Sequence, residues 1–350
     1  MDERAELFCP RCRHLSDGEV VAAPLAPPQR GGVLYWADLD DLAQLQCTNL
    51  QCRQPYPVID GIPVLLPASA ELPQLAPGAL FGGRREMEAQ AALLRGVEPE
   101  QDGARAFARM ARYAWSAFRD GMPAGVQGPL GATALPIHVV DVGSWLAAEG
   151  AAAVGRVLSL GCGLAREPWE VAASSVTLMD AYLPALQASR RLAREGELWV
   201  LLPMEPGRWA PVQVQMPVPL PAVRALCADV CDPPLGACAF DTVLMLNLVD
   251  SVHNPHVALG QACALLAPGG HLALSTPFTW RAQITAPARW TNAYPGVLDS
   301  AAGLALDMAY LGEGLRLVAE RAFLWGLWSF QRELRVYESA GYLWRRESAI

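Results

Sequence analysis

A buried strand that runs directly into a glycine turn constrains the fold of this chain more than any other feature. The strand is the short apolar run Val157 to Leu160, and the turn is Gly161-Cys162-Gly163. Helical composition follows the turn. Glycine lets the backbone come close to a bound ligand, and the N-terminus of the next helix offers free N–H groups. The segment therefore predicts a strand–turn–helix unit with a nucleotide-like ligand at the turn.

Short apolar runs alternate with helical stretches through the second half of the chain. After the first strand, the predicted strands are Val176 to Met179, Val223 to Cys227, Thr242 to Leu246 and His271 to Ser275. This alternation predicts a doubly wound α/β sheet. Two aromatic segments near the end, Phe323 to Phe330 and Val336 to Trp344, have β-like composition with no helix between them. They predict an antiparallel hairpin at the sheet edge.

We expect three parts in the chain: a small ribbon over residues 1–67, a linker with a helical cap over 68–150, and the α/β domain over 151–350. In the middle part, Arg84 to Arg95 and Ala104 to Arg119 have helical composition. The stretch from Leu198 to Pro221 interrupts the α/β alternation with six prolines and two tryptophans. Because so many prolines do not suit a central strand, we expect this insert to cap the ligand site.

The charge balance argues against a nucleic-acid partner. The chain has 35 acidic and 27 basic residues, for a net charge of -8, and binding to phosphates needs clustered basic residues. The first residues are too polar for a signal peptide, and no apolar run approaches the roughly 18 residues of a membrane helix. We therefore expect a cytoplasmic protein with no membrane partner.

Two cysteine pairs stand apart near the start of the chain. Cys9 and Cys12 form one pair, and Cys47 and Cys52 form the other. This spacing is typical of structural zinc, because each turn can present two thiolates to one tetrahedral ion. Four thiolates leave no position for water, so the zinc would hold the fold together rather than catalyse a reaction. Chance cysteines in a small core are the alternative, and His14 is an alternative ligand.

A carboxylate completes the ligand site predicted at the glycine turn. Asp180 ends the second predicted strand, 17 residues after Gly163, where it can accept hydrogen bonds from both ribose hydroxyls. A pyrophosphate-binding turn would have a third glycine, whereas Ala165 follows here. The sequence therefore favours a nucleoside cofactor without phosphate.

The glycine turn and Asp180 resemble motif I of the class I methyltransferases. The resemblance implies S-adenosylmethionine as cofactor and a seven-stranded Rossmann-like sheet. Ala228 to Val230 resembles the adenine-contacting motif, Phe240 to Asn247 the fourth strand, and Leu266 to Leu272 the turn before the fifth strand. The family often has an acidic residue at the position of Ser159. The implied cofactor-binding residues are Gly161, Cys162, Gly163, Asp180, Ala181, Asp229, Val230, Asn247 and Leu248.

The segment after the fourth predicted strand carries the candidate catalytic residues. It places Asn247, Asp250 and His253 near the methyl group, and His253 can serve as a general base. Alternatively, His253 caps the next helix and Asp250 pairs with a backbone amide. Tyr182, just after Asp180, is the third candidate. The alternative to the cofactor and catalytic assignments is a doubly wound fold that no longer has a functional cofactor site.

Several segments resemble the methyltransferase domain of ovothiol biosynthesis, which methylates an imidazole nitrogen of mercaptohistidine. They are Leu244 to Pro255, Ser275 to Trp280, Pro287 to Trp290 and Arg335 to Arg346. The resemblance implies a small polar or heterocyclic acceptor, methylated on nitrogen or sulfur. Aromatic residues would cover this acceptor, namely Tyr182, Phe278 and Trp280 in the domain and Tyr113 and Trp115 before it. Ordinary core packing is the alternative for each of them.

The second cysteine pair opens a segment, Cys52 to Pro67, that resembles the closing strand of zinc-ribbon proteins that activate methyltransferases. The resemblance implies a docking surface for a protein partner. Two rival interpretations remain open. One is an rRNA base methyltransferase with an N-terminal zinc ribbon, and the other is a non-catalytic, cofactor-binding partner protein.

Overall fold

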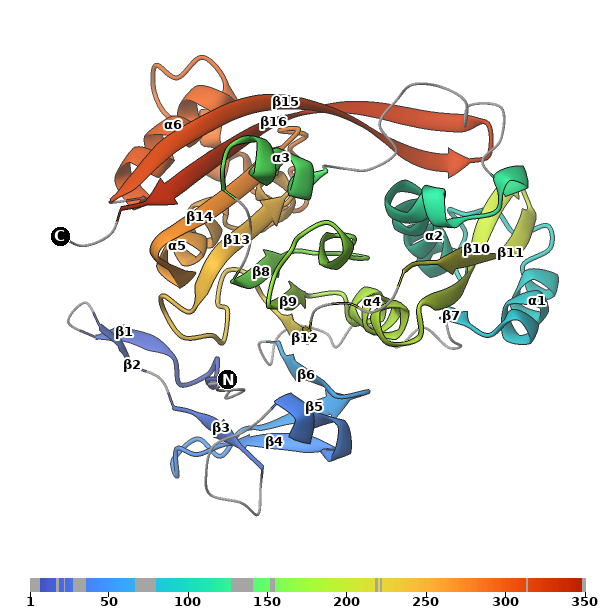
Figure 1. Cartoon of the computed structure of the whole chain (residues 1–350), viewed down its shortest axis with the longest axis horizontal. Helices are drawn as coiled ribbons and strands as arrows, with labels where there is room; N and C mark the ends of the chain where they lie inside the picture. Colours follow the sequence, from blue (N-terminus) through green and yellow to red (C-terminus); the bar gives the residue numbers. More distant parts are fainter. Residues whose placement is uncertain are drawn as a thin grey trace.

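The structure is a computed structural model that describes residues 7–16, 19–21, 23–27, 36–66, 80–126, 141–151, 155–217, 220, 222–312 and 314–347. Most of the predicted linker after residue 67 lies outside these ranges. A large mixed sheet runs through the molecule, and a smaller body of helices and strands lies beside it (Figure 1). None of the described helices combines the length and the apolar character that crossing a bilayer requires.

Five parallel strands form the centre of the large sheet, in the order β14-β13-β8-β9-β12. They are β8 (Arg156–Leu160), β9 (Ser175–Asp180), β12 (Ala222–Ala228), β13 (Phe240–Leu246) and β14 (Leu266–Thr276). Both faces of these strands are buried, which is why their sequences are continuously apolar rather than alternating. On β8, Val157 packs in one hydrophobic cluster and Leu158 in another. The five predicted strands are confirmed.

Helices and short 3-10 turns connect these strands. The α-helices of this part are α3 (Val142–Ala148), α4 (Leu183–Glu195), α5 (Pro255–Leu265) and α6 (Ser300–Leu311). The short turns are η5 (Glu167–Trp169), η6 (Val249–Ser251), η7 (Pro287–Arg289) and η8 (Thr291–Ala293). Only η5 lies between the glycine turn and β9, so the prediction of a full helix after the glycine turn is wrong. α4 ends at Gly196, whose φ of 74° is left-handed and suits glycine at a helix end.

A long antiparallel hairpin closes one edge of the sheet. Its strands are β15 (Leu315–Phe330) and β16 (Glu333–Arg346), and β16 pairs with β14. The predicted terminal hairpin is therefore confirmed, with a first strand that begins eight residues before Phe323. The hairpin extends past the sheet and over the smaller body (Figure 1).

The N-terminal part extends the other edge of the same sheet. Its strands are β3 (Leu25–Ala26), β4 (Gln44–Cys47), β5 (Pro55–Ile59) and β6 (Ile62–Leu65), with β1 (His14–Ser16), β2 (Glu19–Val21) and η1 (Trp36–Asp41) beside them. β6 lies parallel to β12, with Cys227 opposite Val64. Within the described residues the sheet has eleven strands, seven from the α/β part and four from the N-terminal part, so the predicted count of seven is not matched exactly. The residues of β6 are all buried, and they cover a backbone edge that β12 would otherwise expose.

The proline-rich insert is a β-hairpin and not a loop over the site. β10 (Glu197–Glu205) and β11 (Arg208–Gln215) pair with β7 (Phe81–Gly82) in a three-stranded sheet. Pro211 is tolerated because β11 is an edge strand, and Pro203 because β7 pairs only with Trp199 and Val200 of β10. None of the described residues of this hairpin lines the large cavity of the molecule, so the expected cap is wrong.

The hairpin instead supports two predicted helices, α1 (Arg84–Leu93) and α2 (Arg105–Phe118), which are followed by η2 (Arg119–Gly121) and η3 (Ala124–Val126). Leu198 and Leu202 of β10 share a buried cluster with Phe107 and Trp115 of α2. The hairpin therefore provides the apolar layer on which α2 packs (Figure 1).

Close packing between α6 and η8 predicts a strong effect of one added methyl group. A Cβ atom on Gly303 would lie 1.7 Å from the carbonyl oxygen of Thr291, whereas a Cβ on Gly260 of α5 would meet only Leu311, at 3.9 Å. We expect Gly303→Ala to lower the free energy of unfolding by about 1–3 kcal/mol. Gly260→Ala should leave it unchanged or raise it by up to about 1 kcal/mol, because alanine favours helix. Urea unfolding compares the two, and equal stabilities would contradict this packing.

Candidate functional site

A cavity of about 1530 Å³ opens at the carboxyl ends of the parallel strands. Its walls come from the turns after β8, β9, β12 and β13, from α2, and from the hairpin β15–β16. The chain order of the strands reverses between β8 and β13, and ligands of doubly wound sheets bind at such a switch point. The site predicted at the glycine turn is therefore part of a large cavity.

The glycine turn is left-handed at two residues. The φ angles of Gly161 and Gly163 are 63° and 55°, which glycine adopts without strain. The amide of Gly161 donates to the carbonyl of Met179 at 2.8 Å, so the turn is joined to β9. A Cβ on Gly161 would lie 2.4 Å from Leu248. The backbone here must approach its neighbours closely, as the sequence predicts.

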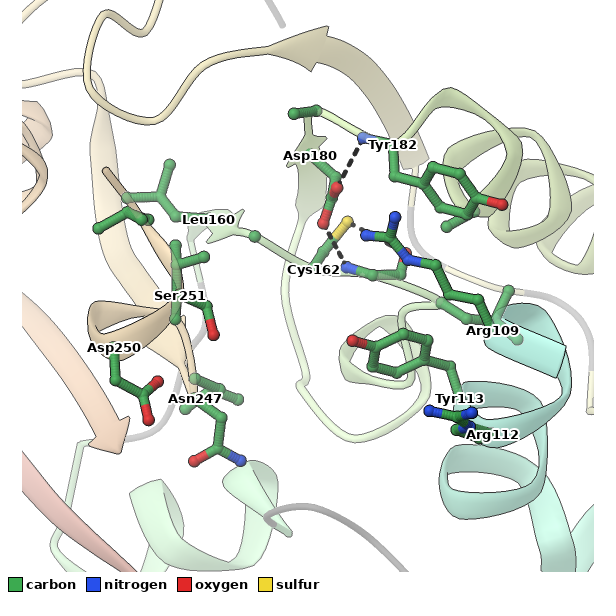
Figure 2. Close-up of a pocket in the computed structure, with 18 of the residues that line it drawn as sticks. Arg109, Arg112, Tyr113, Leu160, Cys162, Asp180, Tyr182, Asn247, Asp250 and Ser251 are labelled. Carbon is green, nitrogen blue, oxygen red and sulfur yellow. Dashed lines mark hydrogen bonds between the residues drawn. The ribbon is translucent and has the colours of Figure 1, made fainter. Parts of the chain in front are cut away.

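Asp180 holds the turns after β8 and β9 together (Figure 2). Its Oδ2 accepts a hydrogen bond from the amide of Gly163 at 2.8 Å, and its Oδ1 accepts one from the amide of Tyr182 at 2.8 Å. Burial raises the pKa of Asp180, while these two amides lower it. A carboxylate has further lone pairs, so Asp180 can still accept from a ligand in the cavity that it lines.

All nine predicted cofactor residues and all three predicted catalytic residues line this one cavity. They come from four separate turns of the chain, and only the sheet brings them together. Their roles stay predictions, because lining a cavity does not by itself assign a role. The cavity-lining residues predicted from the sequence are Gly161, Cys162, Gly163, Asp180, Ala181, Tyr182, Asp229, Val230, Asn247, Leu248, Asp250 and His253.

The two candidates after β13 differ in their surroundings. Asp250 is buried, and its Oδ2 accepts from the amide and the hydroxyl of Thr279 at 2.6 and 2.9 Å. These bonds connect η6 to the segment after β14. Asp250 therefore pairs with a backbone amide, which was the alternative to a catalytic role. The side chain of His253 is 58% exposed, with Nδ1 3.9 Å from Oδ2 of Asp229. Asn254, rather than His253, caps α5, because its side chain accepts from the amide of Val257.

Only some of the predicted aromatic residues lie at the cavity. Tyr113 and Tyr182 line it. Trp115 is fully buried and stacks on Trp328 with ring centroids 5.8 Å apart. Trp280 stacks on Trp290 at 6.1 Å and donates to Ser300. These tryptophans, and Phe278, which packs against the main core cluster, are packing residues and do not line the cavity.

Several residues that line the cavity were not predicted from the sequence. Three arginines of α2 line the cavity, Arg105, Arg109 and Arg112, and the guanidinium of Arg109 lies 4.0 Å from the ring centroid of Tyr182. Their spacing of four and three residues places them on one helix face, a signal that the sequence contains. The hairpin β15–β16 adds Trp325, Leu327, Arg335 and Tyr337. Nothing local in the sequence shows that this hairpin reaches the site.

Two buried acids line the cavity beside the glycine turn. Glu167 is 8% exposed, and burial raises its pKa to about 7. Burial, together with the charge of Glu167, raises the pKa of Glu170 to about 8. The oxygen atoms of Glu170 contact the amide of Val142 at 3.3 Å and the guanidinium of Arg166 at 3.6 Å.

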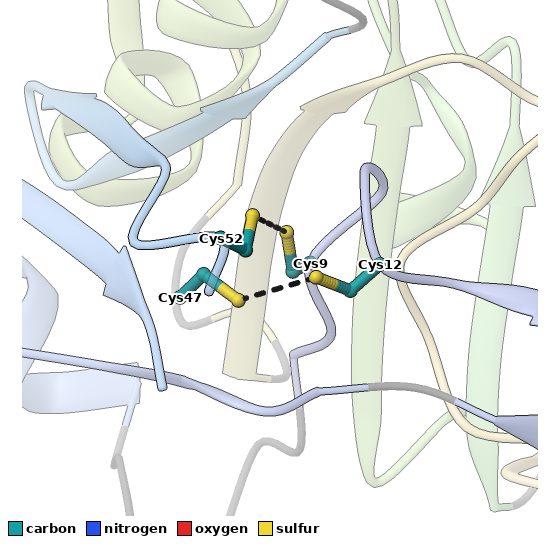
Figure 3. A group of neighbouring side chains, drawn as sticks. All are labelled: Cys9, Cys12, Cys47 and Cys52. Carbon is teal, nitrogen blue, oxygen red and sulfur yellow. Dashed lines mark hydrogen bonds between the residues drawn. The ribbon is translucent and has the colours of Figure 1, made fainter. Parts of the chain in front are cut away.

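The four predicted zinc ligands come together (Figure 3). The Sγ atoms of Cys9 and Cys52 are 3.9 Å apart, and those of Cys12 and Cys47 are 3.6 Å apart. A zinc ion with four sulfurs at 2.3 Å would hold them about 3.8 Å apart in a tetrahedron. The four cysteines therefore fit a tetrahedral metal site. The side chain of His14 lies outside the described part of the chain.

The two buried acids predict a pH dependence of stability. An unfolded glutamate has a pKa of about 4.3, so the folded protein keeps protons on Glu167 and Glu170 that the unfolded chain has released. This contribution to stability is complete below about pH 4 and is lost as pH rises through about 7 and 8. We expect the free energy of unfolding to fall between pH 5 and 8, and to fall less in the double variant Glu167→Gln, Glu170→Gln. The exposed Glu88→Gln is the control, and identical pH profiles for all three proteins would contradict the assignment.

Comparison with known proteins agrees with this site. The family described as methyltransferase domain matches residues 141–337. No curated protein matches the chain.

Solved structures are similar to the chain only at low identity. The N-methyltransferase NodS from Bradyrhizobium japonicum WM9, in complex with S-adenosyl-L-homocysteine, is 14% identical, with 61% of this chain and 93% of that chain covered and a TM-score of 0.37. A putative methyltransferase from Bacillus halodurans C-125 is 13% identical, with 59% and 99% covered and a TM-score of 0.39. The YcgJ protein from Bacillus subtilis is 10% identical, with 60% and 99% covered and a TM-score of 0.40.

The conclusion about the family rests on the domain match and on the site. The matched residues are more than half of the chain, and they include every predicted cofactor-binding residue. The chain therefore belongs to the methyltransferase domain family and is an S-adenosylmethionine-dependent methyltransferase.

Proposed function

We propose that the chain methylates a small polar or heterocyclic acceptor on nitrogen or sulfur, with imidazole compounds as the first class to test. The observation that supports this proposal is the size of the cavity, which extends from the glycine turn to α2 and the hairpin β15–β16. At about 1530 Å³ it exceeds the roughly 300–1,000 Å³ of a typical small-molecule pocket, so a cofactor and an acceptor can share it. The acceptor would lie beside α2 and the hairpin β15–β16, which also line the cavity.

We assign the cofactor to the sheet side of the cavity. S-adenosylmethionine supplies a methyl group on a positively charged sulfur. The glycine turn would follow its methionine part, Asp180 would accept from the ribose hydroxyls, and Asp229 would lie at the adenine. Methyl transfer depends on alignment and on the exclusion of water, so these residues act by holding the two reactants in line.

Asn247 supports a polar ligand. Trp325 donates to Oγ of Ser339 at 2.9 Å, and that hydroxyl donates to Oδ1 of Asn247 at 2.7 Å. An indole N–H can only donate, so the hydroxyl of Ser339 must donate its own proton to the oxygen of the Asn247 amide. The NH₂ group of Asn247 then points away from these bonds and is available as a donor. This Nδ2 is buried and has no hydrogen-bond partner among the described residues. A buried donor is costly when unpaired, so Asn247 suits an oxygen or nitrogen acceptor atom of a ligand.

His253 supports a nucleophile that loses a proton. It is the most exposed of the three predicted catalytic side chains, and Asp229 lies beside it at 3.9 Å. A ring N–H or thiol must lose its proton when it is methylated, and an accessible imidazole can take it. We propose His253 as this base. Asp250 contributes by positioning, through its bonds to Thr279.

We propose that the four cysteines hold a structural zinc ion, as their tetrahedral spacing allows, and that the N-terminal part offers a surface to a protein partner. The resemblance to ovothiol biosynthesis supports an imidazole acceptor, although the β10–β11 insert departs from that family. The net charge of -8 speaks against the rRNA interpretation. Methylation of ribosomal RNA with binding that weakens steeply at higher salt would replace our proposal with that one.

The cofactor assignment predicts a specific role for Asp180. Asp180→Asn keeps the size of the side chain but removes the charge, so we expect S-adenosylhomocysteine to bind about 10- to 100-fold more weakly by calorimetry. The control is Asp241→Asn, a carboxylate of the same sheet that pairs with Arg156 and does not line the cavity. Undiminished binding by Asp180→Asn would refute the ribose assignment. Absence of binding by the unmodified protein would favour the non-catalytic interpretation.

The zinc assignment predicts one zinc ion per chain by elemental analysis. Cys47→Ser removes one of the four sulfurs and should lose the metal and lower the melting temperature, because metal binding contributes to folding. Cys238→Ser is the matched control, since Cys238 is exposed and lies outside the cluster. A zinc content well below one per chain in the unmodified protein would remove the assignment.

A further inference from the structure

Ser159 occupies a position where related methyltransferases often have an acid, and the structure shows which residue lies beside it. Ser159 is fully buried in β8, two residues before Gly161. Its hydroxyl donates to Oε1 of Glu167 at 3.2 Å. A carboxylate therefore lies beside the end of β8 even though β8 itself does not carry one.

The other oxygen of Glu167 has no hydrogen-bond partner among the described residues. Oε2 is buried, and no described residue donates a hydrogen bond to it. Glu167 is itself 92% buried, from its exposure of 8%, and it lines the cavity. A buried carboxylate oxygen without a donor is costly, and such an atom in a cavity wall marks a place for a donor from the ligand.

The surroundings of Glu167 favour a cation. Glu170 and Asp180 line the same cavity, and the charges of Asp180 and Glu167, after burial, raise the pKa of the Cys162 thiol. The nearest arginine in sequence, Arg166, is used elsewhere: it pairs with Asp120 at 2.8 Å and with Glu170 at 3.6 Å. No described basic side chain forms an ion pair with Glu167.

We propose that Glu167 binds the α-ammonium group of the cofactor's methionine part. Glu167 would thus replace the acidic residue that related methyltransferases often have at the position of Ser159. The inference rests on the proposed cofactor site. A primary ammonium carries both the charge that this wall needs and the hydrogen-bond donors that Oε2 lacks. Ser159 acts as a positioning residue, because its hydroxyl holds the carboxylate at the end of β8.

The test compares two ligands by calorimetry, S-adenosylhomocysteine and 5′-methylthioadenosine, which lacks the amino-acid part. Glu167→Gln should weaken S-adenosylhomocysteine binding by about 10- to 100-fold and leave 5′-methylthioadenosine binding unchanged. Equal losses for both ligands, or no loss for either, would overturn the proposal. If the unmodified protein binds neither ligand, the proposed cofactor site itself fails, which is a different outcome.

A second, independent measurement moves the carboxylate from residue 167 to residue 159. The double variant Ser159→Asp, Glu167→Gln moves the carboxylate onto β8 and should recover most of the lost S-adenosylhomocysteine affinity. Asp241→Asn is the matched control, because Asp241 is an acid of the same sheet that pairs with Arg156 and does not line the cavity. It should not change the ratio of the two affinities. Melting curves of all variants show that they are folded, and a double variant that recovers nothing while folded would contradict the assignment.

Discussion

The hydrogen bonds of Asp180 are the interaction on which the rest of the site depends. One carboxylate accepts from the turn after β8 and from the turn after β9, and each turn belongs to a different crossover of the sheet. If these bonds were lost, the left-handed glycine turn would have no partner on β9 other than the carbonyl of Met179. The two bonds fix this side chain in the cavity wall, and its remaining lone pairs are left for a ligand.

The N-terminal part is joined to the same sheet, which connects the cysteine cluster to the site. β6 pairs with the last two residues of β12, and Asp229 follows β12 directly. Arg13, just after Cys12, lies 3.6 Å from Asp232 and donates to Gln261 at 3.0 Å. A metal that orders the cysteine turns would therefore also order the strand end that carries Asp229. The proposed zinc ion would thus have a structural role within the methyltransferase fold.

Both acidic and basic side chains line the cavity. Glu167 and Glu170 line it beside the glycine turn, and Arg105, Arg109 and Arg112 of α2 line it as well, with Arg109 over the ring of Tyr182. The cavity therefore offers groups of both charges to a ligand. It suits a cofactor whose amino-acid end carries both a cation and an anion, together with a small polar acceptor.

The sequence alone determined the five parallel strands, the glycine turn with Asp180, the terminal hairpin and the grouping of four cysteines. These features depend on the periodicity of apolar residues, on turn residues and on the spacing of metal ligands, all of which can be recognised within short stretches of sequence. Only the tertiary structure decided that β6 extends the sheet, that the proline-rich insert supports α2, and that Trp115 and Trp280 are packing residues. It also placed Glu167 beside Ser159. Such pairings depend on which distant surfaces are left uncovered when the sheet forms, and no local pattern encodes them.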